Sequence, residues 1–141
     1  MLGNSNWSVK AGKFINNNAM SFMDYYHFDA NQTIFTNTSG FELLPYYKYS
    51  TNDQFISGNY EHHFGGLILN KFPLIRKLKL GEIAGVNYLT TNTLHQYIEW
   101  YMGVEKLQTF EVILAGGIAQ GEHTYATFRF GISSKGFLSV N

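Results

Sequence analysis

The sequence predicts an all-β fold, an antiparallel up-and-down meander, on the strength of three observations. Aromatic residues make up 17% of the 141 residues, with twelve Phe and ten Tyr, and these side chains favour pleated strands. Segments of about ten residues alternate between apolar and polar side chains, the period of a strand with one apolar face. Short polar or glycine-bearing breaks between the segments are typical of hairpin turns.

Composition excludes several classes of function. Ten basic and ten acidic residues cancel, and only 14% of the chain is charged, so the electrostatic footprint of a nucleic-acid-binding protein is missing. There are no cysteines, which excludes disulfides and thiolate metal sites. No Ser-His-Asp order, phosphate-binding glycine loop or paired-carboxylate motif is present. We therefore expect a single non-catalytic domain at most, without a cofactor.

The first half of the chain predicts three strands and one long connection. Residues 7–14 form the first strand, and residues 15–40, rich in Asn and aromatics, connect it to the second. The second strand covers 41–49 and the third 54–64, separated by a polar turn at 50–53. The alternation in 41–49 places on one face Phe41, Leu43, Tyr47 and Tyr49, and on the other face Glu42, Leu44, Tyr46 and Lys48.

The second half predicts four more strands. Residues 67–80 form a connection with a short amphipathic helix from Pro73, a residue tolerated at a first helical position. The strands follow at 81–90, 95–104, 108–118 and 122–132, with turns at 91–93, Glu105–Lys106 and 120–122. Gly65-Gly66 and Gly116-Gly117 are expected at bends or bulges. The domain thus spans 1–132 with about seven strands, followed by a tail at 133–141.

The two faces of the later strands differ in a way that predicts a membrane. One face carries no charge, and we expect it to contact lipid: Ile98, Trp100, Met102, Phe110, Val112, Leu114, Phe128 and Phe130. The opposite face carries Glu99, Glu111 and Arg129, which suits the polar lumen of a transmembrane barrel. Strands of about ten residues match a tilted crossing of the bilayer. We therefore predict the C-terminal part of a transmembrane β-barrel in the cell outer membrane, with membrane lipid as a partner.

Aromatic residues near strand ends are expected to form the interfacial girdles of such a barrel. The candidates are Tyr46, Tyr47, Tyr49, Tyr88, Trp100 and Tyr101.

A basic segment lies in the connection 67–80. Lys71, Arg76, Lys77 and Lys79 alternate with Phe72, Leu74, Ile75 and Leu78. We favour an interfacial role, with cations at lipid phosphates and apolar side chains at the boundary, over a merely solvated turn. Counting hairpins back from a periplasmic C-terminus places this connection on the periplasmic side.

Glu61, His62 and His63 raise the hypothesis of a metal site. Adjacent strand residues point to opposite faces, so the two imidazoles cannot bind one ion together. Glu61 and His63 share a face, and a third ligand such as His95 or Glu99 could join them from another strand. We favour the alternative of a polar lumen residue beside a histidine at the membrane rim.

Residues 60–79 resemble a segment of a Bacteroidota family of outer-membrane proteins. The family pattern is E-H-H-F-x-G, then L-N-K-x-P-L-x-R-K-L-K, then an acidic strand start that Glu82-Ile83 matches. The residues that carry the resemblance are Glu61, His62, His63, Phe64, Gly66, Asn70, Lys71 and Pro73. The family combines a carboxypeptidase-regulatory-like N-terminal domain with a C-terminal barrel of uncharacterised function, and the likeness extends over most of 7–132.

The resemblance implies a barrel of the BamA and TamA class, which assembles or translocates other proteins. Its partners would be the remainder of the barrel or the outer-membrane assembly machinery. Residues 1–6 show no secretory signal, and the upstream domain and most of the family's barrel are missing, so the chain resembles a truncated or separately encoded C-terminal part. If it is a fragment, we expect its free edges to prevent closure on its own. The tail after the last strand departs from the family pattern, in which the final strand ends the chain at an aromatic residue.

Two rival interpretations remain from the sequence. A soluble barrel of the lipocalin or fatty-acid-binding type would hold a small apolar ligand on an inward apolar face. A free-standing membrane barrel of about eight strands is the other.

Overall fold

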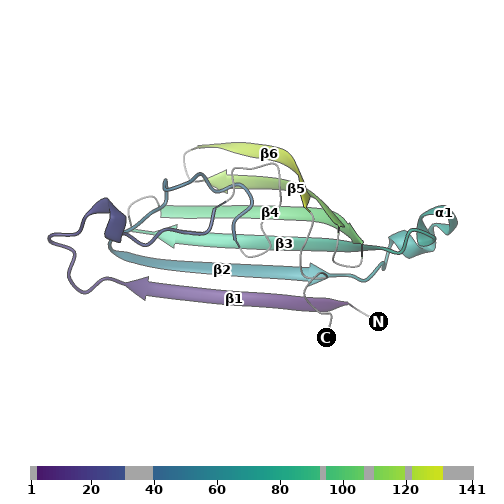
Figure 1. Cartoon of the computed structure of the whole chain (residues 1–141), viewed down its shortest axis with the longest axis horizontal. Helices are drawn as coiled ribbons and strands as arrows, with labels where there is room; N and C mark the ends of the chain where they lie inside the picture. The colour runs from purple at the N-terminus through teal and green to yellow at the C-terminus, as the bar shows by residue number, and fades with distance from the viewer. Residues whose placement is uncertain (1–2, 31–39, 93–94, 107–109, 120–121, 132–141) are drawn as a thin grey trace, which may run out of the picture.

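The computed structural model describes residues 3–30, 40–92, 95–106, 110–119 and 122–131, with side chains except at 95, 110, 111, 119 and 122–131. They form one six-stranded sheet in the order β1-β2-β3-β4-β5-β6, and every neighbouring pair is antiparallel (Figure 1). The predicted all-β antiparallel meander is confirmed. Its strands are β1 (Asn4–Lys13), β2 (Gln54–His63), β3 (Leu80–Thr91), β4 (His95–Lys106), β5 (Phe110–Ala119) and β6 (Glu122–Gly131).

In the part of the chain that the structure describes, helical structure is confined to three short elements. η1 (Phe22–Asp24) lies in the connection between β1 and β2, at the end of the sheet opposite to α1 (Figure 1). η2 (Leu69–Lys71) and α1 (Pro73–Arg76) lie between β2 and β3, and Pro73 occupies the start of α1 as predicted. Among the described residues, no helix is long and apolar enough to cross a membrane.

The register gives the sheet two faces of opposite character. Residues directly opposite each other in antiparallel strands share a face, so the partners Asn59, Asn87 and Glu99 lie on one side of the sheet. We call this the polar face. The apolar face carries the next row of partners: Tyr60, Val86 and Trp100.

The apolar face is uncovered within the described part of the chain. Its large side chains are between 39% and 75% exposed: Trp7, Val9, Ile56, Tyr60, Val86, Ile98, Trp100, Met102 and Ile118. Soluble proteins rarely expose apolar side chains as one contiguous surface, so this face is the first feature that demands a functional explanation.

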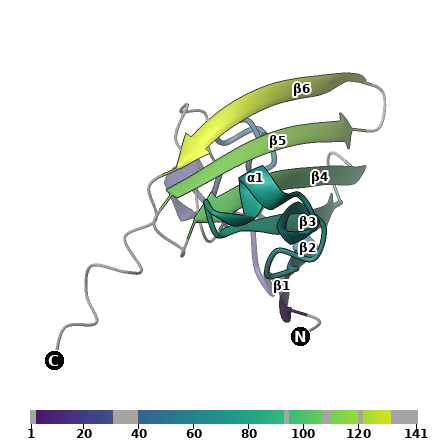
Figure 2. The same cartoon turned by 90° about the vertical axis from the view of Figure 1, so that its right-hand side faces the viewer.

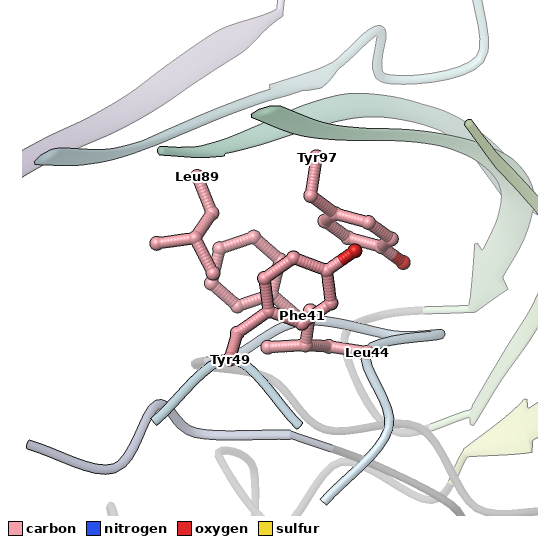
Figure 3. Packing of buried hydrophobic residues seen from close by; sticks show 5 residues of the cluster. All are labelled: Phe41, Leu44, Tyr49, Leu89 and Tyr97. Carbon is pink, nitrogen blue, oxygen red and sulfur yellow. The ribbon is translucent and has the colours of Figure 1, made fainter. Parts of the chain in front are cut away.

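The polar face is covered by residues 40–50, which we call the covering segment. Figure 2 shows the sheet curving from β1 to β6. Three side chains of the covering segment, Phe41, Leu44 and Tyr49, pack against Leu89 of β3 and Tyr97 of β4 (Figure 3). A second apolar cluster lies further along the same face: Ile83, Tyr101, Ile113 and Ala115, with Leu43 packed against it. These two clusters form the core.

The strand predicted at 41–49 is wrong. The covering segment is a run of bends and turns, with Pro45 inside it and Tyr47 at a φ of 62°. Its apolar residues do alternate in part, but Phe41, Leu44 and Tyr49 all reach the same cluster, which a strand would not allow. The described residues therefore contain six strands instead of about seven.

Several boundaries also differ from the prediction. β1 begins at Asn4, three residues earlier than expected. The turn predicted at Glu105–Lys106 is wrong, because both residues pair with β3, opposite Gly81 and Leu80. A register irregularity between Gly117 and Ala119 agrees with the bulge expected there. Of the turn predicted at 120–122, residues 120–121 lie outside the described residues and Glu122 begins β6. The tail at 133–141 also lies outside the described residues.

The girdle prediction fails for five of its six aromatics, including Tyr49, which is buried in the core cluster of the covering segment. Trp100 and Tyr101 lie in the middle of β4, and Tyr101 belongs to the buried cluster of the polar face. Tyr46 and Tyr47 lie in the covering segment, where they are 45% and 62% exposed, and belong to no strand.

Aromatic rings cover strand glycines on both faces. The Tyr101 ring lies over Gly85, where an added Cβ would overlap it. The Trp100 ring lies over Gly116, where a Cβ would come within 2.7 Å. Such pairs hold neighbouring strands in one register, because the aromatic ring has room only where a glycine, which has no side chain, lies opposite it on the next strand.

We predict that Gly85→Ala destabilises the protein by about 1–3 kcal/mol, the usual cost of overpacking, because the Tyr101 ring has to move. Gly58→Ala is the matched control, since a Cβ there meets only the Ser8 carbonyl oxygen at 4.0 Å. The free energy of unfolding in urea, followed by fluorescence, measures both. Equal effects of the two substitutions would contradict this role of the glycine.

Candidate functional site

The Glu99 carboxylate is the centre of a buried polar network on the polar face. Glu99 is fully buried, and its two oxygens accept four hydrogen bonds. Oε1 accepts from the Glu42 backbone N–H at 2.6 Å and from Asn87 Nδ2 at 2.6 Å. Oε2 accepts from the Leu43 backbone N–H at 2.9 Å and from the Tyr97 hydroxyl at 2.8 Å. Hydrogen bonds to a carboxylate are among the strongest in proteins.

The network continues along one row of paired residues. Asn59 donates to Asn87 Oδ1 at 3.0 Å, and Ser8 donates to Asn59 Oδ1 at 3.2 Å. Ser8, Asn59, Asn87 and Glu99 are successive register partners, so the row crosses β1, β2, β3 and β4. It connects an exposed edge strand to the fully buried carboxylate.

This geometry explains why the covering segment is not a strand. Two of its backbone N–H groups, at Glu42 and Leu43, are satisfied by Glu99 and not by a neighbouring strand. A buried backbone donor must find an acceptor, and here a side chain from the middle of the sheet supplies it. Glu99 therefore ties residues 40–50 to the polar face.

A second polar cluster surrounds His63, nearer to α1. Its Nδ1 lies 2.8 Å from Glu105 Oε1 and its Nε2 lies 2.9 Å from Glu61 Oε1. The Tyr101 hydroxyl donates to the other Glu61 oxygen at 2.8 Å. The side chains of His63, Glu61 and Glu105 are only 19%, 26% and 14% exposed, so an imidazole is held between two largely buried carboxylates.

The ligand set considered for a metal is not assembled. Glu61 and His63 do share a face, but Glu99 lies in another row with both oxygens engaged, and the His95 side chain lies outside the described residues. Among the residues that the structure describes, no group of three His, Asp or Glu is arranged to hold a metal ion. Glu105, which the sequence placed in a turn, is the missed member of the His63 cluster.

The predicted lipid-facing residues fall on the apolar face as far as they are described. Ile98, Trp100 and Met102 are exposed there, and Val112 and Leu114 are half-buried. Of the three predicted lumen charges, Glu99 lies on the polar face. The other predictions concern side chains outside the described residues: Phe110, Glu111, Phe128, Arg129 and Phe130.

Residues 67–79, which we call the rim segment, extend from the end of the sheet. The carboxylate of Glu82 fixes its start by accepting from the backbone N–H groups of Ile68, at 2.9 Å, and Leu69. The basic side chains of Lys71, Arg76, Lys77 and Lys79 are exposed. So are five large apolar side chains, between 46% and 82%: Leu67, Ile68, Phe72, Leu74 and Leu78.

The residues of the E-H-H-F-x-G pattern build the junction between β2 and the rim segment. Glu61 and His63 belong to the buried cluster, whereas His62 and Phe64 lie together outside it, with ring centroids 4.4 Å apart. Gly66 has a φ of 84°, and a Cβ there would overlap the Asn70 side chain. Glycine at this position thus permits the turn into η2.

Comparison with known proteins identifies a family. A family model described as the C-terminal domain of a family of unknown function, DUF5686, matches residues 1–104. No curated protein and no solved structure matches the chain.

We predict that Glu99→Ala destabilises the protein by at least about 3 kcal/mol, because unmatched buried donors cost about 1–3 kcal/mol each. It should also speed tryptic cleavage after Lys48, since the covering segment loses its attachment. Urea unfolding and timed proteolysis measure the two effects. Ser8→Ala, at the exposed end of the row, is the control and should change both little. Unchanged cleavage in Glu99→Ala would show that apolar packing alone holds the segment.

Proposed function

The chain belongs to the DUF5686 family, as its C-terminal domain, and on this premise we propose that it crosses an outer membrane as a non-catalytic part of a β-barrel. In this proposal the apolar face contacts lipid and the polar face lines the barrel interior. The functional residues are then the apolar side chains that contact lipid on one face and the polar side chains that line the interior on the other.

One observation carries the proposal: neighbouring residues of β4 have the reverse of the exposure expected in water. Glu99 is fully buried, whereas Ile98 and Trp100 on either side of it are 43% and 39% exposed. A soluble sheet gains stability by burying its apolar face, at about 25 cal/mol per Å². A transmembrane barrel has the opposite requirement, an apolar band outside and a polar interior.

The dimensions and the ends of the sheet support the same assignment. The strands have ten to twelve residues, close to the length that crosses a bilayer at a tilt. The rim segment places cations and exposed apolar side chains together at one end of the sheet, as an interfacial segment does.

The edge of β1 suggests the partner. Within the described chain, β1 pairs on one side only, with β2, and its residues are almost all exposed. In lipid every backbone N–H and C=O must be paired. We propose that the remainder of the barrel pairs with β1, and that this barrel belongs with the BamA and TamA class of the resembling Bacteroidota proteins and serves the assembly or translocation of other proteins.

The soluble ligand-binding barrel is the rival that the geometry favours less. It needs an apolar interior that leaves room for a ligand, whereas the polar face holds the Glu99 and His63 clusters beneath the covering segment. A pocket of about 480 Å³ lies instead at the β1–β2 connection end of the sheet, around Phe55.

The two tryptophans of the chain, Trp7 and Trp100, both lie on the apolar face and test the proposal. With Trp7→Phe, only Trp100 emits. In vesicles of phosphatidylcholine brominated on its acyl chains, we expect strong quenching of Trp100 and little quenching by aqueous iodide, because the ring contacts hydrocarbon.

The matched control moves the single tryptophan to the polar face, as Trp7→Phe/Phe41→Trp/Trp100→Phe. That residue should be far less sensitive to brominated lipid, since position 41 is buried between the covering segment and the sheet. Quenching of Trp100 by iodide, with no response to brominated lipid, would favour the soluble barrel.

Orientation is tested by single cysteines, which the cysteine-free sequence makes simple. We predict that Lys77→Cys reacts with a membrane-impermeant maleimide only after cells are lysed, because the rim segment faces the periplasm. Met23→Cys, 86% exposed at the opposite end of the sheet, should react in intact cells. Labelling of position 77 in intact cells would show that the chain has the opposite orientation in the membrane.

A further inference from the structure

We propose that one anionic phospholipid binds at a defined site where the apolar face meets the rim segment. Its acyl chain would occupy a groove on the apolar face, and its phosphate would be held by cations of the rim segment. This inference rests on the proposed membrane location and adds a specific ligand to it.

The groove lies between β2 and β3 near the α1 end of the sheet. Its volume is about 320 Å³, and its walls are Tyr60, His62, Phe64, Ala84, Gly85 and Val86. The rings of Tyr60 and His62 from β2, with Phe64 just after it, form one side, and the depression lies over the small residues Ala84 and Gly85. His62 is fixed there by Ser5, whose Oγ lies 2.6 Å from His62 Nδ1. The lining is mostly apolar, which suits hydrocarbon.

The rim segment is attached directly beside this groove. Glu82 lies two residues before Ala84, on the same face of β3, and its carboxylate binds the backbone N–H groups of Ile68 and Leu69. The Phe64 backbone N–H also donates to the Glu82 carbonyl oxygen, at 2.8 Å. These bonds hold the start of the rim segment against the end of the groove.

Charge determines the occupant. No acidic residue occurs between Glu61 and Glu82, whereas four basic residues do: Lys71, Arg76, Lys77 and Lys79. Among the described residues no ion pair engages any of these four cations, and Oε1 of Glu82 accepts from two backbone N–H groups of the rim segment. Exposed cations beside exposed apolar side chains attract an anionic membrane surface.

A phospholipid fits this combination better than a free anion or a protein segment. A free phosphate would use the cations but leave the groove and the exposed Phe72 and Leu74 without a function. A protein segment would have to occupy a face that the proposal assigns to lipid. One molecule that joins an acyl chain to a phosphate satisfies both parts of the site.

Native mass spectrometry of the whole chain in dodecylmaltoside, mixed with phosphatidylglycerol or phosphatidylcholine, tests the proposal. We expect one retained phosphatidylglycerol, favoured by roughly tenfold over phosphatidylcholine, because each nearby cation strengthens attraction to an anionic lipid. The variant Lys71→Gln/Arg76→Gln/Lys77→Gln/Lys79→Gln should lose this preference. Ala84→Phe should lose retention of both lipids, since its ring fills the groove; Ala84→Leu replaces it if circular dichroism shows a disrupted sheet.

Controls separate this site from general charge effects and from the proposed function. Lys10→Gln/Lys13→Gln removes two cations of β1 and should leave the preference unchanged. Inorganic phosphate should fail to displace the lipid; full displacement would reveal a simple anion site and overturn the proposal. Equal retention of the two lipids by the wild-type chain, with Trp100 still quenched by brominated lipid, would overturn the lipid site while leaving the membrane location intact.

Discussion

The rest of the structure depends on the burial of one carboxylate. Glu99 is fully enclosed, and this is tolerable only because four donors converge on it, two from side chains of the sheet and two from the backbone of the covering segment. The same bonds hold the covering segment on the polar face, where Phe41, Leu44 and Tyr49 then complete the core. Polar and apolar contacts therefore support each other: the carboxylate needs the segment as a donor, and the segment needs the carboxylate as an acceptor.

The opposed faces make the register of the sheet critical. A slip of one residue in β4 would turn Glu99 to the apolar face and bring Trp100 into its place beneath the covering segment. Several contacts oppose such a slip. The Tyr101 ring fits over Gly85 and the Trp100 ring over Gly116, and the asparagine row meets Glu99 only in the observed pairing. Glycine, a poor strand former by itself, thus contributes to this sheet by receiving a ring.

The sequence predicts the elements that have a short hydrophobic period, and it misses the segments whose conformation depends on partners distant in the chain. Alternation of two located all six described strands, and the position of Pro73 located α1. The same alternation misled at 41–49, because its apolar residues serve a loop whose conformation is set by Glu99, 56 and 57 residues away. Glu105 is a similar case: local sequence predicts a turn there, whereas its partner His63 is 42 residues distant. Glu99 was recognised as a polar-face charge, but nothing in local spacing reveals which backbone groups it binds.

The residues of the E-H-H-F pattern lie on both faces of the sheet, one polar and one apolar. In a strand, Glu61 and His63 must point to one side, and His62 must point to the other. The first pair joins Glu105 and Tyr101 in the enclosed polar cluster, while His62, with Phe64, lines a groove on the apolar face. Two adjacent histidines, which at first suggest a shared metal ion, are instead separated by the sheet itself. The pair therefore places one histidine in the enclosed polar cluster and one on the apolar face, close to where the strand gives way to the basic rim segment.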